Sequence, residues 1–320
     1  MISALREVYF MKNEKEIPVF FAADENYMPF LSVTLTSMKK YSSPNCNYEI
    51  YILYTGELGA NAELVKGLAE DNFNISFVDV SEKIELIQSV MRCRDYYTSA
   101  IYFRLFIPDL FPQYKKAIYL DCDIVLLADI AELYEKDIGE NYIGAVADEV
   151  VASVPEFKAY TKNALGIEAS TYFNSGVITM NLEKLRALDF YKTFYGILSS
   201  YDFVVAPDQD CLNLICQGKV YYYGGEWNKM PMAGDKTAQP KLIHYNLCMK
   251  PWHYEGILFE EYFWEFAKQT PFYEVILEKK AAFTKAHANR DKKDSKNLLK
   301  LAQSEADSPN NYLRTVGQTR

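Results

Sequence analysis

The 320-residue sequence contains no apolar run close to the roughly 20 residues that a membrane-spanning helix needs. Its first 18 residues carry six charged side chains and no uninterrupted apolar segment, so no secretory signal is recognisable. We therefore expect a cytoplasmic protein.

The sequence also lacks any Cys-x-x-Cys pair among its six cysteines, and it has only three histidines. Cys122, Cys211 and Cys216 stand in apolar or helical segments, which is typical of buried, reduced thiols. Disulfides and a zinc site are therefore not expected.

Charge is distributed unevenly. The net charge is −9, yet residues 279–300 hold eight Lys or Arg against two Asp, so the rest of the chain is strongly acidic. An acidic body argues against general nucleic-acid binding. The basic segment has two interpretations: a solvated helix, or, together with the aromatic residues before it, a contact of residues 259–300 with an anionic membrane at the inner face of the cell.

The apolar pattern predicts an α/β fold. Strand-like runs over residues 17–23, 48–54 and 75–80 alternate with helix-like segments over 26–40 and 61–71. This alternation is typical of a mostly parallel central sheet that is flanked by helices. Further strands are expected at 142–146 and 176–180, and further helices at 98–106, 182–198 and 208–217.

Composition divides the chain into three parts. We expect a catalytic domain over residues 1–258, and an aromatic and basic C-terminal helical extension over 259–302. Residues 303–320 are polar and are predicted to form a flexible tail.

Two carboxylates, Asp121 and Asp123, stand one residue apart inside an apolar run that is predicted to be a buried strand. Side chains at i and i+2 of an extended chain point to the same face, so these two like charges converge. A divalent cation such as Mg²⁺ or Mn²⁺ would stabilise them, and it would indicate an enzyme with a phosphorylated substrate. The alternative is a strand end with two solvated carboxylates.

Three other segments carry polar groups at ends of predicted elements. Ala22 and Ala23 would let a flat ring approach the backbone, while Asp24 or Asn26 could hydrogen-bond a base edge and Tyr27 could stack on it. Asp24 and Asn26 could equally be helix caps. In the second Asp-x-Asp, Asp208-Gln209-Asp210, Asp208 could instead be the N-cap of a helix and Asp210 a residue of its first turn. His244, taken alone, could be an ordinary core histidine.

As an ordered set, these segments resemble the motif series of family 8 glycosyltransferases, which are retaining enzymes. The matching segments are FAADENY, SAIYFRL, IYLDCDIVL, YFNSGVITMNL, PDQDCLN and HYNLCMKPWH, from about Ile17 to about Phe266. The resemblance implies a GT-A fold, a UDP-sugar donor and a Mn²⁺ cofactor, with Mg²⁺ as the second choice.

The resemblance also implies roles for individual residues. The metal-ligand positions are Asp121, Asp123 and His244. The nucleotide contacts are Ala22, Ala23, Asp24, Asn26, Tyr27, Asp121, Cys122 and Lys250, of which Lys250 faces the diphosphate. The sugar contacts are Arg104, Asn174, Ser175, Asp208 and Gln209, of which Asp208 and Gln209 lie beside the anomeric carbon as catalytic residues.

Two positions depart from the family pattern. Leu247 stands where the family often has Gly close to the diphosphate, and a leucine fits there if its φ stays negative. Cys122 stands where a small residue is common, and its backbone role survives that change.

The expected function is transfer of glucose or galactose from UDP-glucose or UDP-galactose to a cell-envelope glycan or a lipid-linked saccharide. One alternative is a metal-dependent nucleotidyltransferase, although no Gly-rich phosphate loop follows the first predicted strand. The other is a catalytically weak UDP-sugar-binding or membrane-surface protein, against which the intact set of metal-binding residues argues.

Overall fold

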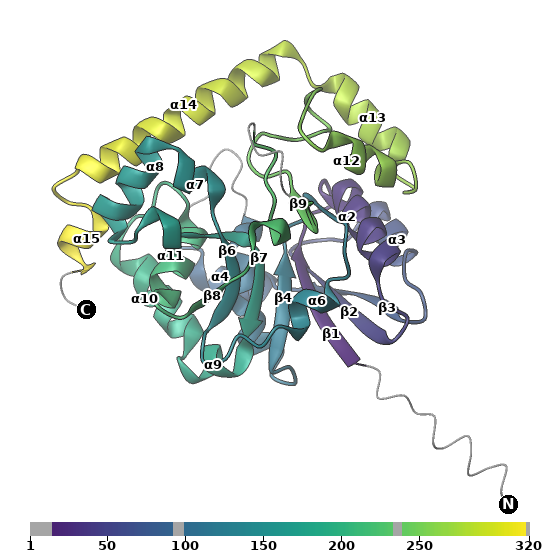
Figure 1. The fold of residues 1–320 in the computed structure, drawn as a ribbon, viewed down its shortest axis with the longest axis horizontal. Helices are drawn as coiled ribbons and strands as arrows, with labels where there is room; N and C mark the ends of the chain where they lie inside the picture. Colours follow the sequence, from purple (N-terminus) through teal and green to yellow (C-terminus); the bar gives the residue numbers. More distant parts are fainter. Residues whose placement is uncertain (1–14, 92–98, 233–238, 318–320) are drawn as a thin grey trace, which may run out of the picture.

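The computed structural model describes residues 15–91, 99–232 and 239–317. Its centre is a seven-stranded sheet with the order β3-β2-β1-β4-β7-β6-β8, and helices flank it (Figure 1). β1 (Lys15–Ala22), β2 (Cys46–Tyr54), β3 (Phe73–Asp79) and β4 (Lys116–Leu120) are mutually parallel. The predicted fold class, with a mostly parallel sheet between helices, is confirmed.

One strand reverses direction within this sheet. β7 (Phe173–Asn181) lies antiparallel between β4 and β6 (Ile143–Ala147), and β8 (Val220–Tyr222) pairs with β6 in parallel. The amino end of β7 therefore meets the carboxyl end of β4. Ligands of such sheets bind outside the carboxyl ends of the parallel strands, so this edge is where a site is expected.

A second, two-stranded antiparallel sheet pairs β5 (Ile124–Leu126) with β9 (Leu242–His244). In its register Ile124 lies opposite His244. This pairing brings a histidine from far along the chain next to the loop that follows β4.

The two faces of the main sheet carry separate cores, as the two-residue alternation of a strand requires. In β1, Val19 and Phe21 belong to one apolar cluster and Phe20 to the other. The first cluster includes α2 (Met28–Tyr41), α12 (Glu260–Ala267) and α13 (Tyr273–Ala282). The second lies under α8 (Pro155–Tyr160), α9 (Leu182–Ala187), α10 (Phe190–Ser200) and α11 (Pro207–Cys216).

Apart from the C-terminal helices described next, the other helices of the described residues are short connectors. They are α3 (Ala60–Lys66), α4 (Ser81–Ile87), η2 (Ser99–Phe106), α5 (Ile107–Leu110), α6 (Ala131–Glu135), α7 (Glu149–Ser153), η3 (Thr161–Leu165), η4 (Ala169–Thr171) and η5 (Gly225–Trp227). The helix expected over 98–106 is a 3₁₀-helix from Ser99, and residue 98 lies outside the described residues. The single helix predicted over 182–198 is two helices, because Asp189 between α9 and α10 has a left-handed φ of 52°.

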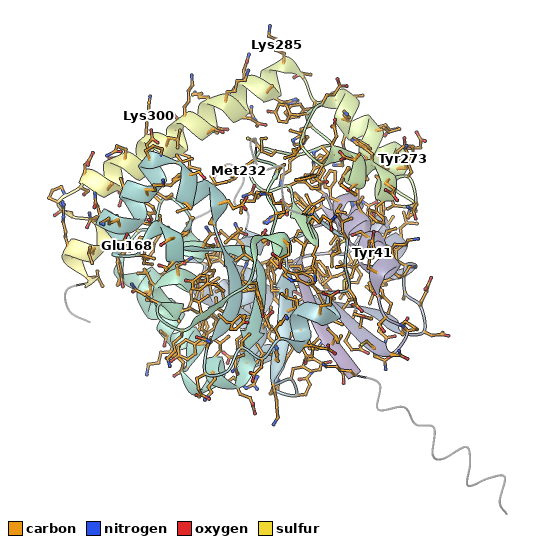
Figure 2. All side chains as sticks on the ribbon, viewed as in Figure 1. Tyr41, Glu168, Met232, Tyr273, Lys285 and Lys300 are labelled. Atoms are coloured by element: carbon orange, nitrogen blue, oxygen red, sulfur yellow. The ribbon has the colours of Figure 1, made fainter. Side chains whose placement is uncertain are left out.

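The C-terminal segment crosses the molecule. α14 (Lys285–Asp307) runs from α13 over the top of the domain to α8, as Figure 1 shows, and α15 (Tyr312–Thr315) follows it. Lys285 and Lys300 mark the basic part of α14 in Figure 2. Among the described residues, no helix has both the length and the apolar character that a bilayer crossing requires.

The prediction of a flexible tail over 303–320 differs from the structure. α14 continues to Asp307, and Tyr312 is 2% exposed because it packs against Tyr201 and Phe203. A few apolar side chains are enough to dock a polar segment when their spacing matches one helix face. The tail's last three residues, 318–320, lie outside the described residues, and the domain boundary at residue 258 stays a prediction.

Candidate active site

Two carboxylates and an imidazole meet at the carboxyl edge of the sheet. The Nε2 atom of His244 lies 3.1 Å from Oδ1 of Asp123 and 3.6 Å from Oδ2 of Asp121. Ligand atoms of all three side chains lie within 4.8 Å of one another. Main-chain hydrogen bonds fix the loop between β4 and β5. The Asp121 amide donates to the carbonyl oxygen of Gly176, and the Tyr245 amide donates to the carbonyl oxygen of Asp123.

A chain of hydrogen bonds determines which nitrogen of His244 carries the proton. The Gly176 amide donates to Oδ1 of Asn174, so that oxygen is an acceptor and the Asn228 amide group must donate to it. Oδ1 of Asn228 then accepts from Nδ1 of His244 at 2.9 Å. When the ring is neutral, its Nε2 atom therefore carries the lone pair, which is directed at the two carboxylates.

This arrangement fits a divalent cation. Nε2 of His244 and Oδ1 of Asp123 are both buried and lack a hydrogen-bond partner among the described residues, and with the ring neutral both are acceptors. Burial alone would raise the pKa of Asp123, but the Lys250 ammonium group holds it below its ordinary value, so the carboxylate is charged. Two carboxylate oxygens beside one imidazole nitrogen form a donor set that suits Mn²⁺.

The close approach of these side chains depends on a glycine. A Cβ atom at position 176 would lie 2.4 Å from Cε1 of His244 and 2.5 Å from Oδ2 of Asp121. Gly176 follows Asn174 and Ser175 in β7, so the same short segment provides side chains and the space for the cluster.

Helix α2 also anchors the loop between β4 and β5. The Thr34 hydroxyl in α2 lies 3.0 Å from the carbonyl oxygen of Cys122 and 2.7 Å from that of Ile124. Thr34 is fully buried. The backbone on both sides of Asp123 is therefore anchored to a core helix.

Arg104 positions two acidic residues. Its side chain is 3% exposed, and it donates to Oδ1 of Asp121 at 3.0 Å and to the carbonyl oxygen of Ser175. Its Nε atom lies 3.7 Å from Oδ2 of Asp208. Arg104 thus links η2 to the loop that carries Asp121 and to α11, and this linking contact was not anticipated from the sequence.

Lys250 lies against the carboxylates. Its ammonium group forms an ion pair with Oδ2 of Asp123 and donates to the carbonyl oxygen of Tyr245 at 2.7 Å. The side chain is 7% exposed, so the positive charge is held at one place. A fixed cation beside the cluster could offset the charge of a phosphate group.

The residues predicted to bind the nucleotide surround the carboxyl end of β1. Ala22, Ala23, Asp24, Asn26 and Tyr27 line the same cavity as the carboxylate–histidine cluster. Oδ1 of Asp24 accepts from the Tyr27 amide at 2.9 Å and so stabilises the turn before α2. The N-cap of α2 is Tyr27, and no side chain caps it, so the alternative interpretation of Asp24 and Asn26 as helix caps is wrong. The side chains of Asp24 and Asn26 are exposed.

The residues predicted to bind the sugar form a polar network at the amino end of β7. Oε1 of Gln209 accepts from the Ser175 amide at 2.9 Å, and the Asn174 amide group lies 3.3 Å from the same atom. Burial raises the pKa of Asp208, while Arg104 opposes that shift. The N-cap of α11 is Ala206, so Asp208 is not the cap that its alternative interpretation proposed.

Asp210 lies behind this network. It is fully buried, and its carboxyl group accepts hydrogen bonds from the hydroxyls of Tyr160 and Tyr172 at 2.7 and 2.6 Å. Burial raises the pKa of Asp210 to about 7, although the two tyrosines oppose the shift. Asp210 joins α8 and β7 to α11.

The site is one cavity of about 510 Å³. All of the residues predicted from the sequence to bind metal, nucleotide or sugar line it. Three polar residues that contribute to the network were not predicted: Asp148, which accepts from Gln209 and Asn174; Asn228; and Thr34. Asp148 directly follows β6, so it could have been predicted from the tendency of ligand sites to lie at the carboxyl ends of strands. Asn228 follows no such strand in the sequence, so no comparable pattern predicts it.

The two departures from the family pattern have different outcomes. The Leu247 backbone has a φ of 51°, so the condition given for a leucine to fit there, a negative φ, is not met. The loop keeps a left-handed turn, which costs about 1–2 kcal/mol for a residue with a Cβ. The Cys122 thiol donates to the carbonyl oxygen of Ala22 at 3.2 Å and ties the ends of β4 and β1 together.

Comparison with known proteins identifies the family. Residues 18–256 match the sequence model described as "Glycosyl transferase family 8". The chain belongs to this family. This membership makes the protein a glycosyltransferase and removes the nucleotidyltransferase alternative.

Several individual glycosyltransferases are similar to most of this chain. The lipopolysaccharide 1,2-glucosyltransferase of Escherichia coli is 30% identical over 73% of this chain and 72% of its own length. The galactosyltransferase LgtC, solved with donor and acceptor sugar analogues, has a TM-score of 0.70 at 28% identity over 80% of this chain and 96% of its own. The bifunctional glycosyltransferase WbbM has a TM-score of 0.71 at 26% identity, over 83% of this chain and 52% of its own.

Replacing Gly176 tests the geometry of the carboxylate–histidine cluster. The added methyl group of Gly176→Ala would separate Asp121 from His244, so we expect Mn²⁺ affinity to fall at least about tenfold. Electron paramagnetic resonance of free Mn²⁺ measures this change. Gly196→Ala in α10 is the control, since no described neighbour lies within 4 Å of its added Cβ. Equal Mn²⁺ affinity in both variants would contradict the site.

Asp210 should make stability depend on pH. Its pKa rises from about 4 in the unfolded chain to about 7 in the folded protein. The protonated Asp210 therefore makes its full contribution to the free energy of unfolding below pH 4, and this contribution is lost as the pH rises towards 7. Relative to Asp210→Asn, the free energy of unfolding of the wild type should fall over this interval in urea titrations.

A second variant checks the cause of this dependence. Tyr172→Phe removes a hydrogen bond that favours the carboxylate, so it should move the change in stability to higher pH. If wild type and Asp210→Asn respond to pH identically, Asp210 is not the group responsible.

Proposed function

We propose that the protein is a metal-dependent, retaining hexosyltransferase that uses UDP-glucose or UDP-galactose. The acceptor is a saccharide or lipid-linked saccharide of the cell envelope. The observation that carries this proposal is the cluster of Asp121, Asp123 and His244, whose buried lone pairs converge in a cavity beside the end of β1.

Two relatives support the choice of hexose. The Escherichia coli relative is named a glucosyltransferase and LgtC a galactosyltransferase. Both sugars have the same size and differ in one hydroxyl orientation, and the polar network of Asn174, Ser175 and Gln209 could bind either. The acceptor class follows from the lipopolysaccharide named for the first relative.

The proposed metal site has a defined chemical role. Asp121, Asp123 and His244 would hold Mn²⁺, which as a Lewis acid offsets negative charge on a departing diphosphate. Lys250 adds a fixed positive charge on the same side. Tyr27 and the small residues Ala22 and Ala23 would hold the uracil ring at the end of β1.

Retention of configuration is proposed to occur by front-face displacement. The bond between the anomeric carbon and the UDP oxygen breaks, and the acceptor oxygen bonds to that carbon on the same face. The departing phosphate oxygen takes the acceptor's hydroxyl proton. Gln209 is a poor nucleophile, and Asp208 lies beside Arg104 and Ser175, so both are better suited to orient the sugar than to attack it.

A donor screen tests this function. Purified protein is incubated with single UDP-sugars, with and without Mn²⁺, and released UDP is measured. We expect Mn²⁺-dependent release from UDP-glucose or UDP-galactose, and Asp123→Asn should reduce it by about a hundredfold or more. Asp71→Asn, at an exposed carboxylate, is the control. Unchanged release in a folded Asp123→Asn variant would refute the metal site, and no release by the wild type would favour the sugar-binding alternative.

A membrane contact is proposed for the basic extension. Lys285, Lys292, Lys296 and Lys300 lie along α14 at spacings that share one side of the helix, and all four are exposed. Each lysine close to an anionic surface contributes about 1 kcal/mol. The proposal supports a peripheral location at the cytoplasmic face of a membrane, where lipid-linked acceptors would be accessible.

Vesicle sedimentation tests this contact with the full chain. Replacing the four lysines Lys285, Lys292, Lys296 and Lys300 by Gln should release the protein from vesicles that contain phosphatidylglycerol. The matched control replaces four exposed lysines elsewhere, Lys66, Lys115, Lys192 and Lys219. Equal binding of both variants would show that α14 is not the contact.

A further inference from the structure

A second cavity lies beside the active site, under the first half of α14. It has a volume of about 460 Å³, within the range of about 300–1,000 Å³ that small-molecule sites occupy. Its wall comes from α2, α13, α14 and the loop after Lys250. None of the roles assigned above uses this space.

The two cavities adjoin each other. His253 and Asp291 line both of them. Asp291 is 8% exposed, and the Tyr254 hydroxyl donates to its carboxylate at 2.7 Å. A molecule that extends from the active site could therefore continue past these two residues into the second cavity.

α14 has two faces of different chemistry. His287, Asp291, Asp294 and Leu298 recur at three- or four-residue spacing and line one or the other cavity. The opposite side carries the exposed lysines, including Lys293. The face towards the cavities thus has its own set of side chains, distinct from the basic surface.

Aromatic rings form part of the second cavity's wall. The imidazole of His253 stacks on Phe283 with ring centroids 4.2 Å apart, and Phe30 of α2 also lines the cavity. Burial lowers the pKa of His253 to about 4, so its ring is neutral at pH 7. Phe30 also stacks on Trp252, with ring centroids 4.0 Å apart, so these rings form an aromatic part of the wall against which the apolar side of a sugar ring can pack.

Charged groups with unused hydrogen-bonding capacity surround these rings. Within the described part of the chain, Arg290 and Asp294 make no hydrogen bond or ion pair, and the ammonium group of Lys279 has only a contact 5.8 Å from the Phe30 ring centre. Arg290 offers several donors, and Asp294 offers acceptors. The hydroxyl groups of a polyol could therefore accept hydrogen bonds from Arg290 and donate hydrogen bonds to Asp294.

The charges on the wall balance. Lys279 and Arg290 are opposed by Asp291 and Asp294. A phosphate or an anionic lipid headgroup would gain little in such a pocket, because the two carboxylates repel it. A neutral ligand with many hydroxyl groups is compatible with both signs.

From these observations, we propose that the second cavity binds a neutral sugar unit of the acceptor, one or more residues away from the sugar that receives the hexose. This proposal rests on the function proposed above, because it takes the active-site cavity as the place of transfer. The acceptor is accordingly an oligosaccharide of at least two units. The C-terminal helix α14 determines which glycan is accepted.

A glycan array tests the proposal. Fluorescently labelled full-length protein is applied to an array of neutral and phosphorylated bacterial oligosaccharides. We expect the wild type to bind at least one neutral oligosaccharide, and Arg290→Ala and Asp294→Ala each to weaken that binding about tenfold, as loss of a charged hydrogen bond does. Lys293→Ala, which removes a charge from the opposite side of α14, should change it less than about twofold.

Three results would overturn the proposal: no neutral glycan bound by the wild type, binding confined to phosphorylated glycans, or equal losses in Arg290→Ala and Lys293→Ala. Thermal unfolding of each variant checks that the fold is intact. Mn²⁺-dependent UDP release by the wild type without a glycan separates this test from that of the function. If UDP is released and no glycan binds, the second cavity is wrongly assigned while the function stands. If a glycan binds and no UDP is released, the function is refuted, and the second cavity binds a glycan that is not an acceptor.

Discussion

The site depends on a chain of hydrogen bonds that begins at a main-chain amide. The Gly176 N–H can only donate, so Asn174, Asn228 and His244 each have their orientation fixed in turn. With the ring neutral, the result is an imidazole lone pair directed at two carboxylates, whose negative charges Arg104 and Lys250 offset. The segments that carry Asn174, Asn228 and His244 are coupled by this chain of hydrogen bonds, and all three residues are buried.

The antiparallel strand β7 explains why these segments meet. In an all-parallel sheet, the residues before a strand would lie at the opposite edge from the residues after its neighbour. Because β7 runs against β4, Asn174 and Ser175 at its beginning lie beside Asp121 at the end of β4. The small sheet of β5 and β9 then adds His244 by its register with Ile124. Strand direction, and not sequence proximity, thus assembles the cavity.

The sequence predicts the features that follow from local pattern. Apolar or alternating runs predict the parallel strands, and Asp121 and Asp123 stand out because charge interrupts one such run. The prediction that this run is a single strand is wrong, since β4 ends at Leu120, β5 begins at Ile124 and the two carboxylates lie in the loop between them. Features that depend on tertiary contacts were missed. Asn228 contributes by orienting its neighbours through hydrogen bonds. Asp189 separates two helices by a left-handed backbone conformation that its residue type does not require. Tyr312 packs a segment of polar composition against the domain.

The position of α14 also has a consequence for synthesis of the chain. Ala302 and Tyr312 belong to the same apolar cluster as Tyr119 of β4 and Phe173 of β7. A ribosome adds about 5–20 residues per second, so the sheet's strands emerge several seconds before the residues that complete this cluster. Over that interval the apolar surface that α14 and α15 will cover faces solvent. Completion of this cluster, and with it of the wall beside the active site, must therefore wait until Tyr312 has been made.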